Sequence, residues 1–240
     1  MRILSIESSA FPASAAILDD GKITAEFYIN TSFTHSQTLM PMVKSVLELT
    51  KTDIKDIDLI AVDNGPGSFT GVRIGVASAK GLAFPNHTDC LGISSLEALA
   101  CNLFDDRGTK RIYACIDARV KQQYNAVFIL SDGKLTRITE DRVITNEDLI
   151  AEIRGLDTNE EIWLVGDYAV KMSELLGDDS RLHVAPENIR YQKASSVAFA
   201  AYLRSLKGEK QTAQALQPVY LQLPQATREL NSRLSSAKGM

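Results

Sequence analysis

The sequence predicts an α/β protein made of two similar lobes. Along the first third of the chain, strand-like and helix-like periods of apolar residues alternate, which is typical of a sheet covered by helices. The run Ile-Leu-Asp-Asp-Gly-Lys-Ile at 17–23 recurs at 129–135 as Ile-Leu-Ser-Asp-Gly-Lys-Leu, 129 minus 17 or 112 residues later. An acid ends the first strand-like run of each half, Glu7 and Asp117, at an offset of 117 minus 7 or 110. A chance match of common Asp-Gly turns is the alternative, but two features in nearly one register favour an internal duplication.

The first lobe is expected to cover residues 1–106. Apolar runs bounded by turn residues predict strands at 2–8, 14–18, 23–29, 58–63 and 89–93. Apolar residues at helical spacing predict helices at 35–50, 70–84 and 94–104. The last of these helices opens with Ser94 and Glu97, which have the spacing of a capping box. Pro41 is expected in the first turns of the earliest helix, or at a kink in it.

The second lobe is expected to cover residues 107–224, followed by a small, polar and flexible tail at 225–240. Strands are predicted at 111–117, 123–130 and 161–165, and helices after 145, near 169–176 and at 194–207. The last helix is expected to pack back on the first lobe. Two lobes that each open with strand, acid, strand, Asp-Gly turn and strand resemble the duplicated fold of actin, sugar kinases and heat-shock ATPases (the ASKHA fold). That resemblance implies a nucleotide cleft between the lobes.

Composition and charge exclude several classes of protein. The 240 residues are 45% hydrophobic and carry a net charge of -4, so no global positive field exists to hold a polyanion. If RNA is involved, another subunit is therefore expected to bind it. No stretch is apolar for long enough to span a bilayer. The three cysteines are an odd number without metal-site or redox-motif spacing, which favours a reducing cytoplasm.

The most specific stretch is the glycine-rich run 64–75, Asn-Gly-Pro-Gly-Ser-Phe-Thr-Gly-Val-Arg-Ile-Gly, which joins a strand to a helix. Free N–H groups at such a helix start can hold an anion, although many glycine-rich turns are only turns. The helix that follows is apolar nearly all round, so it must be buried on more than one side. It is either a core helix or part of a subunit interface. Gly71 and Gly75 would let a second helix approach closely.

The run from Gly65 to Gly75 resembles the signature of the TsaB family, also called YeaZ, of threonylcarbamoyladenosine (t6A) biosynthesis proteins. Further agreement comes from His35-Ser36, from Ile-Asp-Ala-Arg at 116–119 with Tyr124, and from Pro-Val-Tyr-Leu at 218–221. The resemblance spans residues 1 to about 224. It implies a non-catalytic subunit of the complex that modifies the adenosine beside the anticodon of tRNA.

The catalytic relative of this family, TsaD, binds a metal through two histidines separated by three residues. Ser95 and Leu99 stand at the matching positions here, and a leucine side chain has no lone pair to donate. The resemblance therefore implies no metal, no cofactor and no catalytic residue. It implies docking on a TsaD-like subunit, with a TsaE-like ATPase joining the assembly and tRNA contacted only through the complex. Without TsaD, two copies of the chain are expected to form a homodimer through the same helices.

In the family, the docking surface is formed by helices of the first lobe. The residues expected to contact the partner are Leu39, Val43, Val46, Phe69, Val72, Arg73 and Val76. If so, Val76→Glu weakens docking and leaves the isolated fold largely intact.

A nucleotide-dependent phosphotransferase or hydrolase on the same fold is the alternative function. The residues that match a vestigial nucleotide site are Glu7, Ser8, Ser9, Asp117 and Gly166. The fold normally carries Asp-x-Gly-Thr in the first hairpin and a Gly-Gly pair in the second lobe, so tight ATP binding is not expected. The loop after Arg119 also departs from the family pattern, because it reads Val-Lys-Gln-Gln before the tyrosine.

Overall fold

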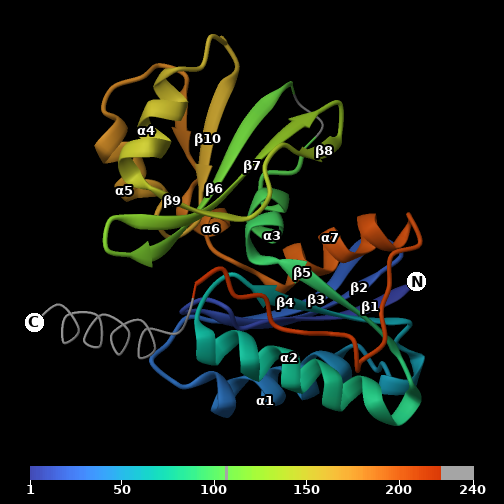
Figure 1. Cartoon of the computed structure of the whole chain (residues 1–240). Coiled ribbons are helices and arrows are strands. Elements are labelled where there is room, and N and C mark those ends of the chain that lie inside the picture. Colours follow the sequence, from blue (N-terminus) through green and yellow to red (C-terminus); the bar gives the residue numbers. More distant parts are fainter. Residues whose placement is uncertain (106–107, 223–240) are drawn as a thin grey trace, which may run out of the picture.

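The computed structural model describes residues 1–105 and 108–222, and its framework is two β-sheets, one per lobe (Figure 1). The first sheet has the strand order β3-β2-β1-β4-β5. Its antiparallel part pairs β1 with β2 and β2 with β3, and its parallel part pairs β1 with β4 and β4 with β5. The strands are β1 (Arg2–Glu7), β2 (Ala13–Asp19), β3 (Lys22–Ile29), β4 (Leu59–Gly65) and β5 (Asp89–Ser94).

The second sheet repeats this pattern, with the order β8-β7-β6-β10-β11. Its first three strands are antiparallel and its last two run parallel to β6. The same pairing in both sheets confirms the predicted α/β fold of two duplicated lobes. The strands are β6 (Lys110–Arg119), β7 (Gln122–Ser131), β8 (Lys134–Arg137), β10 (Glu161–Val165) and β11 (Leu182–Val184). A further strand, β9 (Arg142–Thr145), pairs with the first residues of β7, whereas β8 pairs with its last residues.

The repeated heptapeptides form equivalent hairpins. In the first copy Asp20 and Gly21 have φ of 47° and 82°, and in the second Asp132 and Gly133 have φ of 52° and 66°. Both turns therefore place two successive residues in the left-handed region, which aspartate tolerates and glycine favours. The hairpin predicted between β2 and β3 is confirmed.

The helices form one layer outside each sheet and one layer between the sheets (Figure 1). Below the first sheet lie α1 (His35–Leu49) and α2 (Phe69–Ala83), and on the outer side of the second sheet lie α4 (Asn146–Arg154) and α5 (Ala169–Leu176). Between the sheets lie α3 (Ser95–Cys101) and α7 (Ala194–Ser205). The remaining short helices are η1 (Ile54–Asp56), η2 (Phe84–Asn86) and α6 (Glu187–Arg190).

The two central helices are exchanged between the lobes. Although α3 follows the first sheet in the chain, Leu96 and Leu99 pack into the core of the second sheet beside Ile112. In return α7 packs on β1 and β2, where Val197 joins the cluster that contains Ile3. The layer between the sheets is therefore built from both halves of the chain.

Only one half of the expected capping box is formed at the start of α3. The Ser94 hydroxyl accepts the N–H groups of Leu96 and Glu97, as predicted. The Glu97 carboxylate lies instead 3.5 Å from Arg137 and 3.6 Å from Arg204. These contacts join α3 to β8 and α7, so the glutamate ties the two lobes together. The helix ends at Cys101, before the expected Phe104.

Two expectations fall outside the described residues: the boundary between lobes at 106 and 107, and the tail at 225–240. Among the described residues, no helix is both long and apolar enough to cross a membrane.

Candidate functional site

A cleft of about 760 Å³ opens between the two lobes. Its first-lobe wall is the hairpin after β1, the loop 31–36 and the turn before α2, and its second-lobe wall includes Asp117, Arg119 and Tyr124. Gln192 lines the cleft and is fully buried, and neither of its amide atoms has a hydrogen-bond partner among the described residues. Buried amide atoms of this kind are normally satisfied by water or a ligand.

The glycine-rich turn packs directly on the hairpin after β1. The Ser68 N–H donates to the Ser9 carbonyl at 2.7 Å. A Cβ at Gly71 would lie 2.0 Å from the Ser8 carbonyl oxygen, and one at Gly75 would lie 2.6 Å from the Ser8 hydroxyl. These glycines therefore permit close approach of α2 to its own sheet. The expectation that they admit a second helix is wrong.

Residues 216–220, near the end of the described chain, run over the same turn and are called the strap below. The Val219 N–H donates to the Asn64 carbonyl at 2.8 Å, and the Tyr220 ring stacks on Phe69 with 4.6 Å between centroids. A Cβ at Gly65 would lie 2.5 Å from the Val219 carbonyl oxygen. Leu216 lies in the core next to α2. The strap is therefore the second cover that the apolar sequence of α2 requires.

The residues expected for a vestigial nucleotide site do not form one exposed surface. Ser9 and Asp117 line the cleft. Glu7 and Ser8 are fully buried, and the Ser8 hydroxyl donates to the Gly71 carbonyl at 2.9 Å. Gly166 is buried against the Cys115 carbonyl, where a Cβ would lie 2.1 Å from the oxygen. The hairpin after β1 is thus covered by the glycine-rich turn and the start of α2.

Beneath that hairpin, two carboxyl groups are buried together. Glu7 ends β1 and Asp63 lies near the end of β4, and both are fully buried. Burial, followed by the charge of Asp63 and a hydrogen bond with it, raises the pKa of Glu7 well above its ordinary value. Burial also raises the pKa of Asp63. Glu7 could be predicted from the sequence as a site residue, whereas the only signal for Asp63 was an acid inside an apolar strand.

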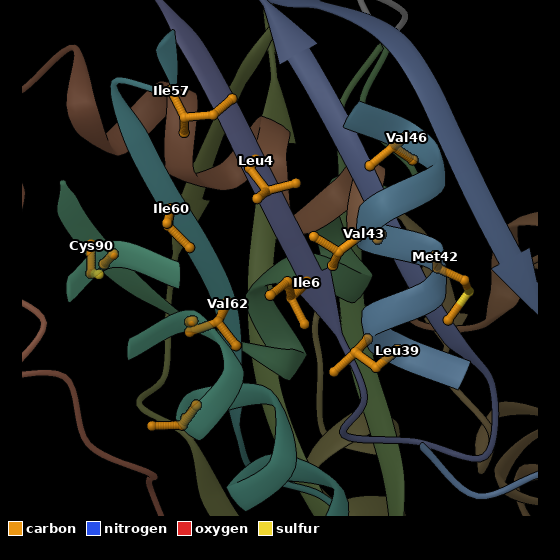
Figure 2. Packing of buried hydrophobic residues seen from close by; sticks show 14 of the residues in the cluster. Leu4, Ile6, Leu39, Met42, Val43, Val46, Ile57, Ile60, Val62 and Cys90 are labelled. Atoms are coloured by element: carbon orange, nitrogen blue, oxygen red, sulfur yellow. The ribbon is translucent and has the colours of Figure 1, made fainter. Parts of the chain in front are cut away.

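Five of the predicted interface residues lie in the core of the first lobe. Leu39, Val43 and Val46 point from α1 toward Leu4 and Ile6 of the sheet (Figure 2). Val72 and Val76 of α2 belong to the same cluster, and each of the five is at most 3% exposed. Their identification as contact residues is wrong, because the stripe of apolar residues that marks a docking helix also marks the face that covers a sheet.

The other two predicted interface residues lie nearer the surface. Phe69 lines the interlobe cleft and is half-buried beneath the Tyr220 ring, and Arg73 is exposed with its guanidinium 5.3 Å from the Phe69 centroid. The helical face that is accessible to a partner carries other side chains. Among its exposed residues are Met40, Lys44 and Glu48 of α1 and Arg73, Ala77, Gly81 and Phe84 at and after α2.

Ser95 and Leu99, at the positions that match the metal-binding histidines of the catalytic relative, have structural roles. The Ser95 hydroxyl donates to the Asp63 carboxylate at 2.5 Å, and Leu99 packs in the core of the second lobe. In the part of the chain that the structure describes, no group of three or more histidine, cysteine, aspartate and glutamate residues is placed to hold a metal. His35 instead opens α1, where its Nε2–H donates to the Ala10 carbonyl at 2.8 Å.

The loop that departs from the family pattern has an unusual backbone. Arg119, Val120 and Lys121 have φ of 66°, 52° and 59°, so three successive residues with side chains are left-handed. The Val120 side chain is 86% exposed. A β-branched residue is disfavoured in this region by about 1 kcal/mol or more.

We expect Val120→Asn to raise the free energy of unfolding by about 0.5–1 kcal/mol, because asparagine tolerates the left-handed region better than valine does. Urea denaturation of both chains measures the difference. Val120→Ala is the matched control, since it removes the same exposed methyl groups without supplying that tolerance. Equal stability of the asparagine and alanine variants would show that the backbone at this residue carries no strain.

The chain is similar to proteins of one modification pathway. A family model described as TsaD, tRNA N6-adenosine threonylcarbamoyltransferase, matches residues 29–229. The tRNA threonylcarbamoyladenosine biosynthesis protein TsaB of Escherichia coli (strain K12) is 29% identical over 230 residues, covering 96% of this chain and 98% of that protein. TsaB of Bacillus subtilis (strain 168) is 31% identical over 231 residues, covering 94% and 96%. The solved structure of YeaZ from Pseudomonas aeruginosa matches with a TM-score of 0.77 and 26% identity, over 92% of this chain and 99% of that one.

Proposed function

Because the chain belongs to the TsaB family of tRNA threonylcarbamoyladenosine biosynthesis proteins, we propose that it is a non-catalytic subunit that docks on a TsaD-like catalytic subunit. Ser95 and Leu99, at the positions of the metal histidines, support the non-catalytic role. A TsaE-like ATPase joins the assembly, and tRNA is held through the complex. Phosphotransfer is the weaker alternative, since Glu7 and Ser8 are buried beneath the turn before α2.

The docking surface of this proposal is the outer face of α1 and α2, the exposed residues given above. This face presents Met40, which is 42% exposed, and Phe84, which is 65% exposed. The exposed residues of α2 also include the small residues Ala77 and Gly81. A helical face that combines large apolar side chains with small residues suits the close approach of a helix from another protein.

Gly81 gives the strongest support to this docking surface. It lies inside α2, where glycine costs about 1 kcal/mol relative to alanine. Nothing within 4 Å would meet a Cβ at this position, so the fold of the isolated chain does not require glycine there. Gly71 and Gly75 differ, because the chain itself fills the space in front of each. A partner helix packed on the outer face would explain the missing side chain.

We expect Ala77→Arg to weaken binding to a TsaD homologue by at least about 2 kcal/mol, roughly 30-fold in Kd, because the long charged side chain holds the partner helix away. Isothermal titration of the purified chain into the TsaD homologue measures this. Ala151→Arg is the matched control, since Ala151 is an exposed alanine on α4 of the other lobe. Equal affinity of the Ala77→Arg and wild-type chains would refute docking through this face.

Light scattering of the same variants without TsaD tests whether two copies pair through this face. A homodimer that Ala77→Arg dissociates and Ala151→Arg preserves would support one surface for both contacts. The modification reaction supplies a second readout: tRNA modified by the TsaD homologue should increase when this chain is added and should remain absent with this chain alone.

A further inference from the structure

The Glu7–Asp63 pair lacks the usual compensation for buried charge. Two carboxylates in contact inside a protein require a cation or a proton, because desolvation and mutual repulsion both oppose a double negative charge. Neither residue forms an ion pair with lysine, arginine or histidine among the described residues. Both side chains are fully buried, so bulk water does not screen them.

The hydrogen bonds around the pair distinguish the two carboxyl groups. Asp63 Oδ1 accepts the Gly65 N–H at 2.9 Å and the Ser95 hydroxyl, and the Ser9 hydroxyl lies 3.0 Å from Oδ2. Glu7 Oε1 accepts the Ser9 N–H at 2.6 Å, whereas Glu7 Oε2 has no donor within reach. The Ser9 hydroxyl has a single hydrogen to donate, and it also lies 2.8 Å from Glu7 Oε1. Asp63 therefore has two donors of its own and Glu7 has one, which favours the anion at Asp63. An oxygen without a donor is where a carboxylic acid carries its hydrogen.

We propose that Glu7 and Asp63 share one buried proton, carried on Glu7 Oε2, and that this proton holds together the hairpin after β1, the turn before α2 and the start of α3. The shared hydrogen bond connects β1 directly to β4. Ser9 extends it to the hairpin that lines the interlobe cleft, and Ser95 extends it to the layer between the sheets. The proton thus stabilises the junction of β1, β4 and the start of α3, independently of which partner the outer helices bind.

Among the described residues, α1 brings His35 against the hairpin after β1, where its Nε2 lies 2.8 Å from the Ala10 carbonyl, and His35 forms no ion pair with Glu7 or Asp63. On β2, Ser14 lies opposite Glu7, and on β3 the ionisable group that senses Glu7 is Tyr28. On α2 the neighbours are Gly71 and Gly75, which pack on Ser8. On α7 the Ala194 N–H donates to the Ser14 hydroxyl. The titration of the site is therefore governed by the pair itself.

The sign of the pH dependence follows from the raised pKa of Glu7, which burial and Asp63 lift well above the ordinary value of 4.5. The folded chain keeps a proton that the unfolded chain releases above pH 4.5. Its contribution to stability is therefore complete below pH 4.5 and is lost as the pH rises through the folded pKa. Between pH 4.5 and the pKa of Glu7 in the folded chain, the folding equilibrium constant falls by about tenfold per pH unit.

We expect Glu7→Gln to remove this dependence, because a neutral amide donates to Asp63 without binding a proton. Urea denaturation of the full chain, at pH values spaced from about 5 to about 8, should show the variant-to-wild-type ratio of folding constants rising by about tenfold per unit until the pH reaches the pKa of Glu7 in the folded chain, and level above it. Glu48→Gln is the matched control, since Glu48 is an exposed carboxylate on α1 with a side chain 63% exposed. Its ratio to wild type should stay constant with pH.

Infrared difference spectroscopy identifies the proton directly. The wild-type chain at neutral pH should show the carbonyl stretch of a protonated carboxylic acid, and Asp63→Asn should shift or remove that band even if Glu7→Gln does not fold. The proposal is overturned if the wild-type chain shows no such band at neutral pH. It is equally overturned if metal analysis finds a stoichiometric cation whose chelation changes the stability, because the cation would then compensate the charge in place of the proton.

Discussion

Val76→Glu is expected to lower the free energy of unfolding by about 4 kcal/mol, enough to unfold much of the population of an ordinary domain. The reason is burial: Val76 is 3% exposed and lies in the cluster between α2 and the first sheet. A carboxylate there would lose its water without gaining a cation. Urea denaturation with circular dichroism as the signal measures the loss.

Ala77→Glu provides the matched control, since Ala77 is the next residue on α2 and is exposed. We expect its stability to stay within about 0.5 kcal/mol of wild type, while its affinity for a TsaD homologue falls. The two variants therefore separate folding from docking on one helix. A stable Val76→Glu chain with weakened docking would restore the sequence-based expectation that Val76 is a contact residue.

Gly71→Ala is expected to destabilise the chain by about 3 kcal/mol, because its Cβ would lie 2.0 Å from the Ser8 carbonyl oxygen. Relief of that contact requires α2 to move away from the first sheet. The resulting shift should also disturb the hairpin that lines the interlobe cleft. Thermal unfolding followed by calorimetry measures the change.

The opposite sign is expected for Gly81→Ala on the same helix. Its Cβ would meet nothing within 4 Å, so the better helix propensity of alanine should raise the stability by about 1 kcal/mol. Stabilisation by both substitutions to the same extent would mean that helix propensity, and not the close approach to Ser8, decides the outcome at Gly71.

The fold could be predicted well from the sequence because the residue patterns that specify its turns and its repeat involve neighbouring residues. Asp20-Gly21 and Asp132-Gly133 specify tight turns by their own backbone preferences, and the repeat relates the two lobes without any knowledge of packing. The short strand β11 (Leu182–Val184) and the strand β9 (Arg142–Thr145) were missed. Neither has an alternation long enough to be distinguished from a loop, and both are fixed by pairing with strands distant in the sequence.

The candidate site was harder to predict because burial depends on distant parts of the chain. The apolar stripe Leu39, Val43 and Val46 indicates that something covers α1, but the sequence does not state whether that is a sheet or a partner. For α2, the strap at 216–220 covers a side that otherwise suggested a subunit interface. The carboxyl pair was invisible for the same reason, since Glu7 and Asp63 meet only when β1 and β4 align.

The exchange of α3 and α7 between the lobes means that neither half of this chain is a self-sufficient folding unit. A fragment ending after residue 105 would leave the inner side of its sheet without the apolar cover that Val197 and Ala201 supply. The complementary fragment would lack Leu96 and Leu99. Duplication of an ancestral half thus produced two modules that each depend on the other, and the fragments should become soluble only when they are produced together.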